Sequence, residues 1–341
     1  MQKITLPLLG ALVMVITSCH HFDDFLDEVE PTNPVSKVFT TGLNAPMGLA
    51  MGSQNRLWVS ENGLGDFEGQ VSLIMPSGKA YPAIVGFPTA INVEGLPGGL
   101  NNILYKDGML YILNTVDGKL YMADVSTFKA GDTPMQANTL MSQDIRTFVL
   151  EQDFGDEDTH ESNIYNLAFG PGGDLFIADA AANIILRRDA ATGDLSVFAL
   201  FPDIANPTPV GPPTIDVVPT GLAWDGEHFF VSTLTGFPFP TGEARIYQLD
   251  AQGNISTYQE GFTTLVDIAL GHNNQPVVLQ HSEFSLANGG FQHMTGRIII
   301  ADGTNQVILK DKLNFPTALV LDGRKAYVTS LEDGTVTRII W

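Results

Sequence analysis

The sequence predicts an all-β fold, a six-bladed β-propeller with four-stranded blades, closed by pairing of the N-terminal strand with the last blade. Two observations lead to this prediction. Four kinds of strand recur in a constant order, and the 306 residues from Ser36 to Trp341 divide into six units of about 51 residues. Four short strands in about 50 residues, repeated six times, are typical of a propeller.

The second strand of each unit gives the clearest repeat, a β-branched and aromatic run that follows a Gly, Asn or Asp turn. These second strands are expected at 56–62, 109–115, 174–180, 228–234, 275–281 and 325–331. First strands precede them by about ten residues, at 47–51, 102–105, 165–169, 220–224, 266–270 and 317–321. Third strands follow at 70–74, 119–123, 183–187, 244–248, 297–301 and 335–339.

The fourth strand predicts how the ring closes. Five copies are expected, at 81–85, 146–150, 196–200, 256–260 and 306–310. The sixth copy stands at the front of the chain, at 37–41, ahead of the first full unit. We therefore expect residues 37–41 to pair beside 335–340 as the outermost strand of the last blade. A helical period competes with strand only within 125–144.

The N-terminal residues predict that the protein is exported to the cell envelope. The apolar run from Ile4 to Ile16 is about 13 residues long, too short to span a bilayer but typical of a secretory signal. The segment from Ile16 to Cys19 resembles a bacterial lipobox, so residues 1–18 are predicted to be a lipoprotein signal peptide and Cys19 the lipidated residue. The alternative is an ordinary signal peptide.

A lipidated Cys19 implies three segments and a location. Residues 19–35 are interpreted as an acidic tether and residues 36–341 as the propeller. The protein is expected in the cell envelope, lipid-anchored, in the outer membrane and either periplasmic or surface-exposed. Its membrane contact is then the anchor alone, because one lipidated terminus holds a domain that stays in water.

Composition excludes several functional classes. The chain has 38 Asp and Glu against 17 Lys and Arg, a formal net charge of −21, and a pI near 4.4. Such a charge repels a phosphate backbone, so no nucleic-acid partner is expected. A single Cys allows neither an intramolecular disulfide nor a CxxC metal or redox site.

Loop lengths predict which face binds. Loops after first and third strands are tight, apart from the segment 125–144. The long loops follow second and fourth strands, at 61–69, 88–102, 151–163, 201–220, 233–244 and 281–296. Elaborated loops on one rim of a rigid scaffold favour a binding surface there, although neutral drift in loop length is the alternative. Four phenylalanines of these loops form either a contact patch or loop packing: Phe237, Phe239, Phe284 and Phe291.

Polar residues near the inner strands predict an axial site. The ligand-binding candidates are Glu61, Asn102, Asn166, Asp179, Asp267 and His281, and the metal candidates are Glu61, Asn102, Asn166 and Asp267. Carboxylate and amide oxygens suit Ca²⁺ or another divalent metal. The alternative is that these residues cap strand ends and bond loop amides. No GxSxG, HExxH, Walker or GxGxxG motif occurs, so no catalytic residue is assigned.

Several segments resemble the ScyD/ScyE family of six-bladed propellers, whose members include bacterial lipoproteins. The most specific of them are 218–223, 234–242 and 244–247, followed by 261–263 with 266–267, 178–180 with Asn183, and 42–46 with 48–49. In the third blade Ser162, Asn163 and Tyr165 fit a Ser-Asn-Pro-Tyr-Gly pattern of the family, whereas Ile164 and Asn166 depart from it. The resemblance implies an extracytoplasmic propeller, with no reaction assigned to the family.

Three functions stay open at this point. The first is a membrane-tethered module that binds a small molecule or a protein at the long-loop face. The second is a metal-dependent, lactonase-like hydrolase, in which an axial Ca²⁺ or Zn²⁺ polarises a carbonyl or activates water. The third is a quinone-dependent dehydrogenase, which needs a His base and several cations; His281 is the only candidate base, and Arg residues are few.

Overall fold

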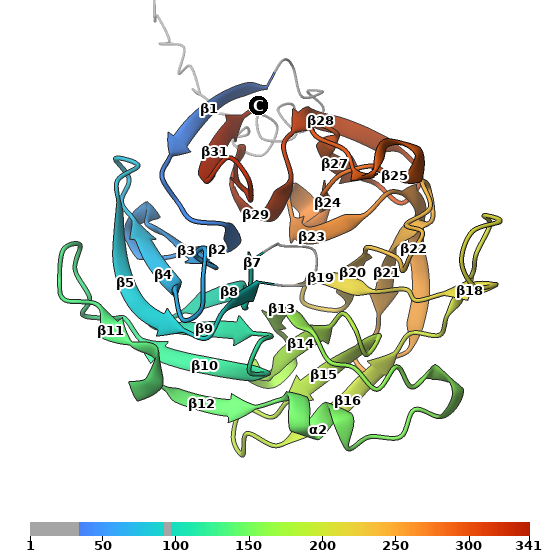
Figure 1. Ribbon diagram of the computed structural model, residues 1–341, viewed down its shortest axis with the longest axis horizontal. Coiled ribbons are helices and arrows are strands. Elements are labelled where there is room, and N and C mark those ends of the chain that lie inside the picture. Colours follow the sequence, from blue (N-terminus) through green and yellow to red (C-terminus); the bar gives the residue numbers. More distant parts are fainter. Residues whose placement is uncertain (1–33, 92–96) are drawn as a thin grey trace, which may run out of the picture. The chain divides into compact units, whose positions relative to one another are not determined.

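The computed structural model describes residues 34–91 and 97–341, which form six sheets around a common axis (Figure 1). The predicted signal peptide and Cys19 lie outside the described residues. We number the blades in chain order. Blade 1 contains β2 (Pro46–Met51), β3 (Leu57–Glu61), β4 (Gly69–Ile74) and β5 (Ala80–Phe87). Blade 2 contains β8 (Leu100–Lys106), β9 (Met109–Asn114), β10 (Lys119–Asp124) and β12 (Met141–Asp144).

The other four blades repeat the same antiparallel order. Blade 3 contains β13 (Ile164–Phe169), β14 (Leu175–Asp179), β15 (Ile184–Arg188) and β16 (Leu195–Leu200). Blade 4 contains β19 (Pro219–Trp224), β20 (Phe229–Thr233), β21 (Ala244–Leu249) and β22 (Ile255–Phe262). Blade 5 contains β23 (Leu265–Leu270), β24 (Pro276–Gln280), β27 (Gly296–Ala301) and β28 (Gln306–Leu313). Blade 6 contains β29 (Pro316–Asp322), β30 (Lys325–Ser330), β31 (Thr335–Ile340) and β1 (Val35–Thr40).

Short elements decorate the connections. Three two-residue hairpins are β6 (Ala90–Ile91) with β7 (Pro97–Gly98), β17 (Ile204–Ala205) with β18 (Thr214–Ile215), and β25 (Phe284–Ser285) with β26 (Gly290–Phe291). The helices are α2 (Arg146–Leu150) and single 3₁₀ turns at Ser53–Asn55, Ala137–Thr139, Gly155–Glu157, Pro171–Gly173, His272–Asn274 and Leu286–Asn288. Within the described ranges, no helix is long and apolar enough to span a membrane.

The hydrophobic core is divided among the blade interfaces. Buried apolar residues of the described part form six clusters, and each lies between two neighbouring blades. Trp58 of blade 1, for example, packs in one cluster with Ile112 of blade 2. Each strand face that points at a neighbouring blade is therefore apolar, which is why the second and third strands read as β-branched and aromatic runs.

The predicted closure of the ring is confirmed. Strand β1 pairs antiparallel with β31, with Val35 opposite Ile340 and Thr40 opposite Val336. The closure is reinforced at the inner strands, where the Thr317 hydroxyl of blade 6 donates a hydrogen bond of 2.9 Å to the Pro46 carbonyl of blade 1.

One predicted strand is wrong. Residues 146–150 form the short helix α2, and the fourth strand of blade 2 is β12, which pairs with β10. The Asp144 carboxylate ends this strand because it accepts hydrogen bonds from both the backbone N–H and the hydroxyl of Thr147, which turns the chain into the helix. An Asp three residues before a Thr was the signal that could have indicated the turn.

The 125–140 segment joins two blades. Strand β11 (Met135–Gln136) pairs in parallel with β5 and adds a fifth strand to blade 1. Phe128 is buried beside Trp58, with ring centroids 6.3 Å apart. The 125–140 segment, which is longer than the other loops after first and third strands, therefore connects blade 2 to the outer edge of blade 1.

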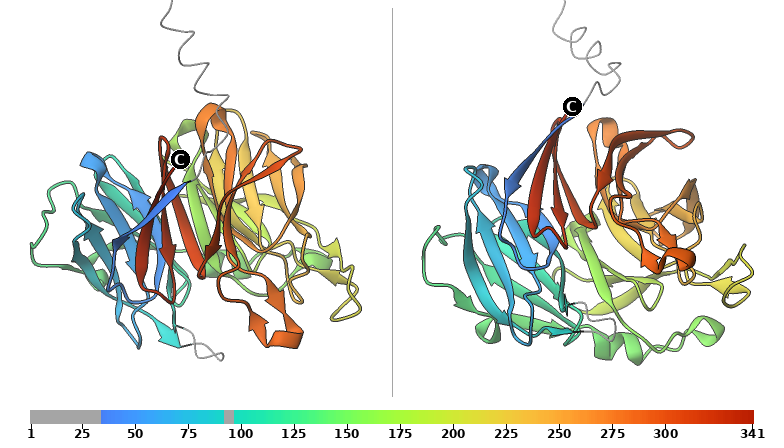
Figure 2. Two further views of the ribbon diagram at one scale, coloured as in Figure 1. Left: turned by 90° about the horizontal axis from the view of Figure 1, so that it is seen from above. Right: turned by 45° about the horizontal axis from the view of Figure 1, so that its top comes forward.

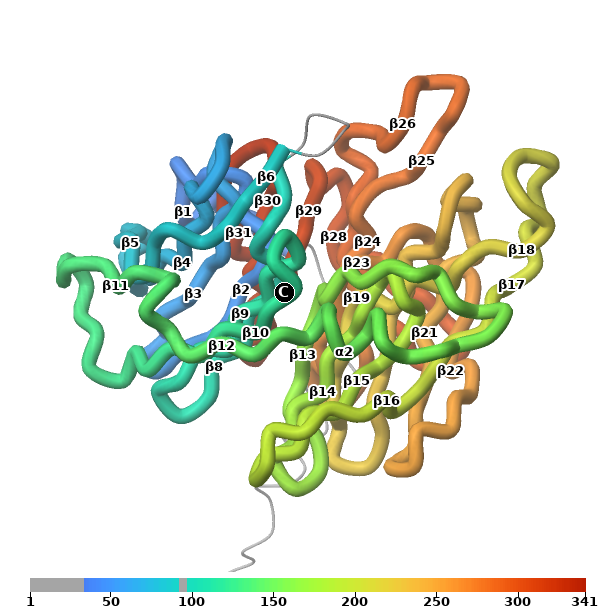
Figure 3. The backbone as a smooth tube through the Cα atoms, turned by 60° about the horizontal axis from the view of Figure 1, so that its bottom comes forward, coloured from blue at the N-terminus to red at the C-terminus, as the bar shows by residue number. Residues whose placement is uncertain are grey.

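The long loops gather on one face of the ring, as predicted. Figure 3 shows the β17–β18 and β25–β26 hairpins and β6 projecting on the same side. In Figure 2 the β25–β26 hairpin and the C-terminal end of the chain lie on opposite sides of the ring. Because Val35 pairs with Ile340, the start of β1 lies on the face opposite the long loops.

Candidate functional site

One position near the start of each inner strand forms an axial ring. In every blade the pairing of the inner strand with the second strand shifts register here, so each ring residue sits at a bulge. The six residues at this position are Gly48, Asn102, Asn166, Gly221, Asp267 and Ala318. Three of the six sequence candidates thus occupy equivalent positions, and the structure brings two of them into contact.

Asp267 joins three blades at this ring. Its Oδ1 accepts hydrogen bonds from Asn166 Nδ2 at 2.9 Å and from the Ile268 N–H, and its Oδ2 accepts one from the Leu319 N–H. Asn166 belongs to blade 3 and Leu319 to blade 6, so the carboxylate of blade 5 reaches past the inner strand of blade 4 on one side. Burial raises the pKa of Asp267 to about 6, and these hydrogen bonds oppose the shift.

Glycine at two ring positions permits this close approach. A Cβ at Gly221 would lie 2.7 Å from the Ile268 nitrogen, and a Cβ at Gly48 would lie 2.6 Å from the Asn102 Cα. Both clashes are with backbone of the next blade, so a side chain there would separate the inner strands. The ring is therefore narrow beside blades 1 and 4, which stand opposite each other.

Two further polar groups face this ring. Asn102 is buried, and its side-chain amide makes no hydrogen bond with the described residues. Tyr165 precedes the ring position of blade 3, and burial together with the nearby Asp267 carboxylate raises the pKa of its phenol. The sequence reasoning missed Tyr165, although its place beside Asn166 in the repeat could have indicated it.

Glu61 and Asp179 do not join the ring. They occupy the last position of the second strand, which is polar and buried in all six blades: Glu61, Asn114, Asp179, Thr233, Gln280 and Ser330. The Glu61 carboxylate accepts hydrogen bonds from the Asn44 N–H, Gln70 and Ser72.

The Asp179 carboxylate is occupied in the same way, within its own blade. It accepts hydrogen bonds from Ser162 and from the N–H groups of Asn163 and Ala182. Burial raises its pKa, against these hydrogen bonds. The carboxylates of Glu61 and Asp179 thus hold the loops of their own blades. This is the capping role expected from the sequence as the alternative to ligand binding.

His281 links two blades. Its Nδ1 lies 2.9 Å from the Pro316 carbonyl of blade 6. In blades 2, 4 and 6 the residue before the ring position makes the equivalent bond, as Thr220 does to the Leu265 carbonyl. Blade 5 has Val266 there, which lacks a donor, and His281 supplies the bond instead. Burial lowers the pKa of His281, so its neutral form is favoured.

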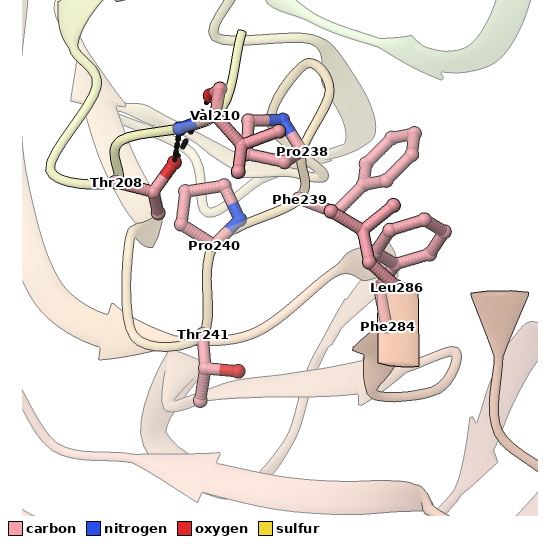
Figure 4. A pocket seen from close by; sticks show the side chains of 8 residues that line it. All are labelled: Thr208, Val210, Pro238, Phe239, Pro240, Thr241, Phe284 and Leu286. Atoms are coloured by element: carbon pink, nitrogen blue, oxygen red, sulfur yellow. Dashed lines mark hydrogen bonds between the residues drawn. The ribbon is translucent and has the colours of Figure 1, made fainter. Parts of the chain in front are cut away.

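The long-loop face holds an apolar pocket over blades 4 and 5. Its volume is about 250 Å³, and Figure 4 shows its walls. The lining residues are Thr208, Val210, Pro238, Phe239, Pro240, Thr241, Phe284 and Leu286. Phe239 and Phe284 pack edge to face with centroids 5.0 Å apart, while Phe237 beside them is 46% exposed. The four phenylalanines thus both pack the loops and present an apolar surface.

Carboxylates lie on loops next to this pocket. The 151–161 loop carries six Asp and Glu residues and neither Lys nor Arg. Its Glu157 accepts a hydrogen bond from the Asp203 N–H, which joins it to the loop that supplies Val210. Burial raises the pKa of Asp203, and the negative charges of Asp216 and Glu157 add to the effect. The pocket is therefore apolar, and the adjoining 151–161 and 201–220 loops carry negative charge.

The axial ring offers few ligands for a metal ion. Asp267 is its one carboxylate, and both of its oxygens already accept hydrogen bonds. Across residues 34–91 and 97–341 there is no group of three or more His, Cys, Asp and Glu side chains that could hold a metal ion. A calcium ion takes six to eight oxygen ligands, so a metal here would depend on the amides of Asn102 and Asn166 and on the Tyr165 hydroxyl.

Comparisons with known proteins agree with the fold. The chain matches no protein-family model and no curated protein sequence. A gluconolactonase from Xanthomonas campestris is similar in structure, with 10% identity, a TM-score of 0.58, and coverage of 91% of this chain and 90% of that one. The PQQ-bound aldose sugar dehydrogenase from Streptomyces coelicolor has 16% identity and a TM-score of 0.56, covering 92% and 99%. Virginiamycin B lyase from Staphylococcus aureus has 12% identity and a TM-score of 0.52, covering 91% and 99%. At these identities the likeness shows a fold, and the chain is a six-bladed β-propeller.

Proposed function

We propose that the chain is a membrane-tethered, extracytoplasmic binding propeller of the ScyD/ScyE type, which holds a ligand or a partner protein at its long-loop face. The observation that carries the proposal is the open apolar pocket over blades 4 and 5, with Phe237 and Leu286 46% and 53% exposed at its edge. Exposed apolar groups gathered on one elaborated face are typical of interaction surfaces.

The three buried carboxylates among the site candidates support a binding role over catalysis. The carboxylates of Glu61, Asp179 and Asp267 are each used by internal hydrogen bonds. A general acid or base has to reach a substrate proton, and these groups are held by backbone amides and neighbouring side chains.

The position of Val35 fits a tether. It lies at the start of β1, on the face opposite the long loops, because it pairs with Ile340. The chain therefore enters the ring at β1 from the side away from the proposed binding face. Substituting Cys19 with Ser is expected to move the protein from the membrane fraction to the soluble fraction, and unchanged fractionation would refute lipidation.

Site-specific photocrosslinking tests the binding role. A benzoylphenylalanine at position 237, on the long-loop face, is expected to give a discrete adduct in cells that produce the protein. The same probe at Arg56, on the opposite face, is the matched control. Adducts at position 56 alone, or at neither position, would overturn the proposal.

A metal-dependent, lactonase-like hydrolase is the second candidate. The observation that favours it is the group of Asn102, Asn166, Asp267 and Tyr165 at the axial ring, where the Asn102 amide has no partner among the described residues. The side-chain oxygens of these four residues would hold the ion, and a bound divalent metal would polarise a substrate carbonyl.

Metal content separates the two candidates. The hydrolase predicts about one divalent ion retained per chain after dialysis, and loss of that ion in Asp267→Ala. Absence of retained metal, together with no thermal shift on adding Ca²⁺, would exclude the hydrolase and leave the binding module.

A further inference from the structure

The pocket on the long-loop face has the size of a receptor for one side chain. Its volume of about 250 Å³ is below the roughly 300–1,000 Å³ that drug-sized ligands occupy. Its open side is bordered by Leu286 and Val210, which are 53% and 38% exposed. A single large apolar group can enter it while the rest of the ligand lies across the surrounding loops.

The polarity of the walls argues against a sugar or a nucleotide. Thr208 and Thr241 are the polar side chains of the lining. The Thr208 hydroxyl is already used, at 2.8 Å from Asn206 Oδ1 and 3.0 Å from the Val210 carbonyl. Ligands rich in hydroxyl or phosphate groups would leave their polar atoms without partners against Phe239, Phe284 and the two prolines.

The charges next to the pocket select a cationic partner. Glu157, Asp203 and Asp216 form no ion pair with any residue that the structure describes. Asp216 lies against the backbone that leads into the pocket, because a Cβ at Gly236 would be 3.3 Å from its Oδ2. The nearby Arg245 and Arg297 are already paired, with Glu243 and Glu260 and with Glu283. The uncompensated charge at this pocket is therefore negative.

We propose that this pocket binds a polypeptide segment whose large apolar side chain enters between Phe239, Phe284 and Leu286, while flanking Lys or Arg residues contact the carboxylates of Glu157, Asp203 and Asp216. The inference rests on the proposed binding function and names its partner. Apolar anchors surrounded by complementary charge are common in protein recognition: the anchor contributes most of the affinity, and the charge contributes selectivity and association rate. A membrane surface is the poorer occupant, because anionic headgroups are repelled by this face.

A display selection from random peptides tests the proposed partner chemistry. The full-length protein is used to select from a library of random dodecapeptides. We expect enriched sequences to carry an aromatic or large aliphatic residue next to Lys or Arg. Their affinity should fall as salt is raised, because the carboxylates are solvent-accessible.

Two variants separate the pocket from the charge. Leu286→Asp adds a negative charge, so a purely electrostatic surface would bind the peptides more tightly, whereas loss of the apolar anchor should weaken binding about 30-fold. The double substitution Glu157→Gln with Asp203→Asn should weaken it severalfold and flatten the salt dependence. Met141→Asp is the matched control, because Met141 is 71% exposed on β12 outside this pocket, and it should leave affinity unchanged.

The outcomes distinguish this inference from the proposed function. Peptides that lack basic residues, or that bind Leu286→Asp as well as the parent protein, would overturn the inference. So would binding to phosphatidylcholine vesicles through Leu286 in place of any peptide. A crosslinked adduct at position 237 would then still support the binding module. If neither peptides nor adducts are found, both proposals fail.

Discussion

Asn166 of blade 3 donates a hydrogen bond of 2.9 Å to the Asp267 carboxylate of blade 5, although the inner strand of blade 4 lies between them in the ring. The second oxygen of Asp267 accepts the Leu319 N–H of blade 6. One buried carboxylate thus couples blades 3, 5 and 6, and Gly221 of blade 4 provides the space for it. The axial ring is first of all a structural joint, and any ligand that enters it has to compete with these bonds.

The pH dependence of stability should reveal Asp267. Its pKa in the folded protein is about 6, above its ordinary value of 3.8, so folding favours the protonated form. This contribution is fully present below about pH 4 and is lost as the pH rises through 6. We expect the free energy of unfolding of the parent protein, relative to Asp267→Asn, to fall by about 2 kcal/mol between about pH 4 and pH 7.

Urea unfolding at several pH values measures this difference. Asp107→Asn, at an exposed turn on the opposite face, is the matched control and should follow the parent curve. Parallel curves for the parent and Asp267→Asn would mean that the carboxylate titrates at its ordinary value and is better solvated than the structure indicates.

Alanine at position 221 should separate the inner strands. Its Cβ would lie 2.7 Å from the Ile268 nitrogen and would also clash with Ser232 Oγ, and the backbone contact cannot relax by a rotamer change. Overpacking of this kind costs about 2 kcal/mol, so Tm should drop by several degrees. Gly98→Ala is the control, because its nearest neighbour among the described residues would be the Ala90 carbonyl at 3.9 Å. Equal Tm values for the two variants would contradict the close approach.

The hydroxyl of Thr317 should matter more for closure than its methyl group. Thr317→Val removes the bond to the Pro46 carbonyl and the 2.8 Å contact with Thr329 Oγ1, so the Pro46 carbonyl loses this buried donor. We expect a loss of about 1–2 kcal/mol in unfolding free energy, with faster hydrogen exchange in β1 and β31. Thr317→Ser retains the hydroxyl and should behave like the parent. A valine variant with parent stability would show that the pairing of β1 with β31 closes the ring unaided.

Phe128 should hold the 125–140 segment against blade 1. Truncation to Ala removes the contact with Trp58 and leaves a cavity, at a cost of about 3 kcal/mol. Because the segment is attached at its edge, local opening should precede global unfolding. We expect faster tryptic cleavage after the exposed Lys129. Met141→Ala, on the neighbouring exposed strand, should leave the cleavage rate unchanged. Unaltered cleavage in Phe128→Ala would show that β11 alone anchors the segment.

The strand pattern could be predicted because its causes are local. Each second strand is a β-branched and aromatic run bounded by turn residues, and this pattern recurs at nearly constant spacing. The prediction of a strand at 146–150 was wrong because side-chain contacts overrode the local strand propensity. Thr147, Phe148 and Val149 favour strand, yet the hydrogen bonds from Thr147 to Asp144 turn the chain after β12.

The polar candidates could be placed in the repeat but not assigned a role. Glu61 and Asp179 occupy a position that is polar in every blade, and such recurrence indicates a structural cap. Asn166 and Asp267 also occupy equivalent positions, but they are 101 residues apart in the chain. Their contact depends on how closely the inner strands approach one another. Gly48 and Gly221 permit this approach because a Cβ at either position would clash with the backbone of the next blade.

The repeat, the pairing of the chain's two ends and the separation of long from short loops follow from residue patterns that act within one unit. The partners of Asp267 and the depth of the pocket beside Phe239 follow from contacts between units, and no single unit contains them. The physical reason is that hydrophobic periodicity acts over neighbouring residues, whereas the distance between two polar atoms across a ring is set by the packing of all six blades at once.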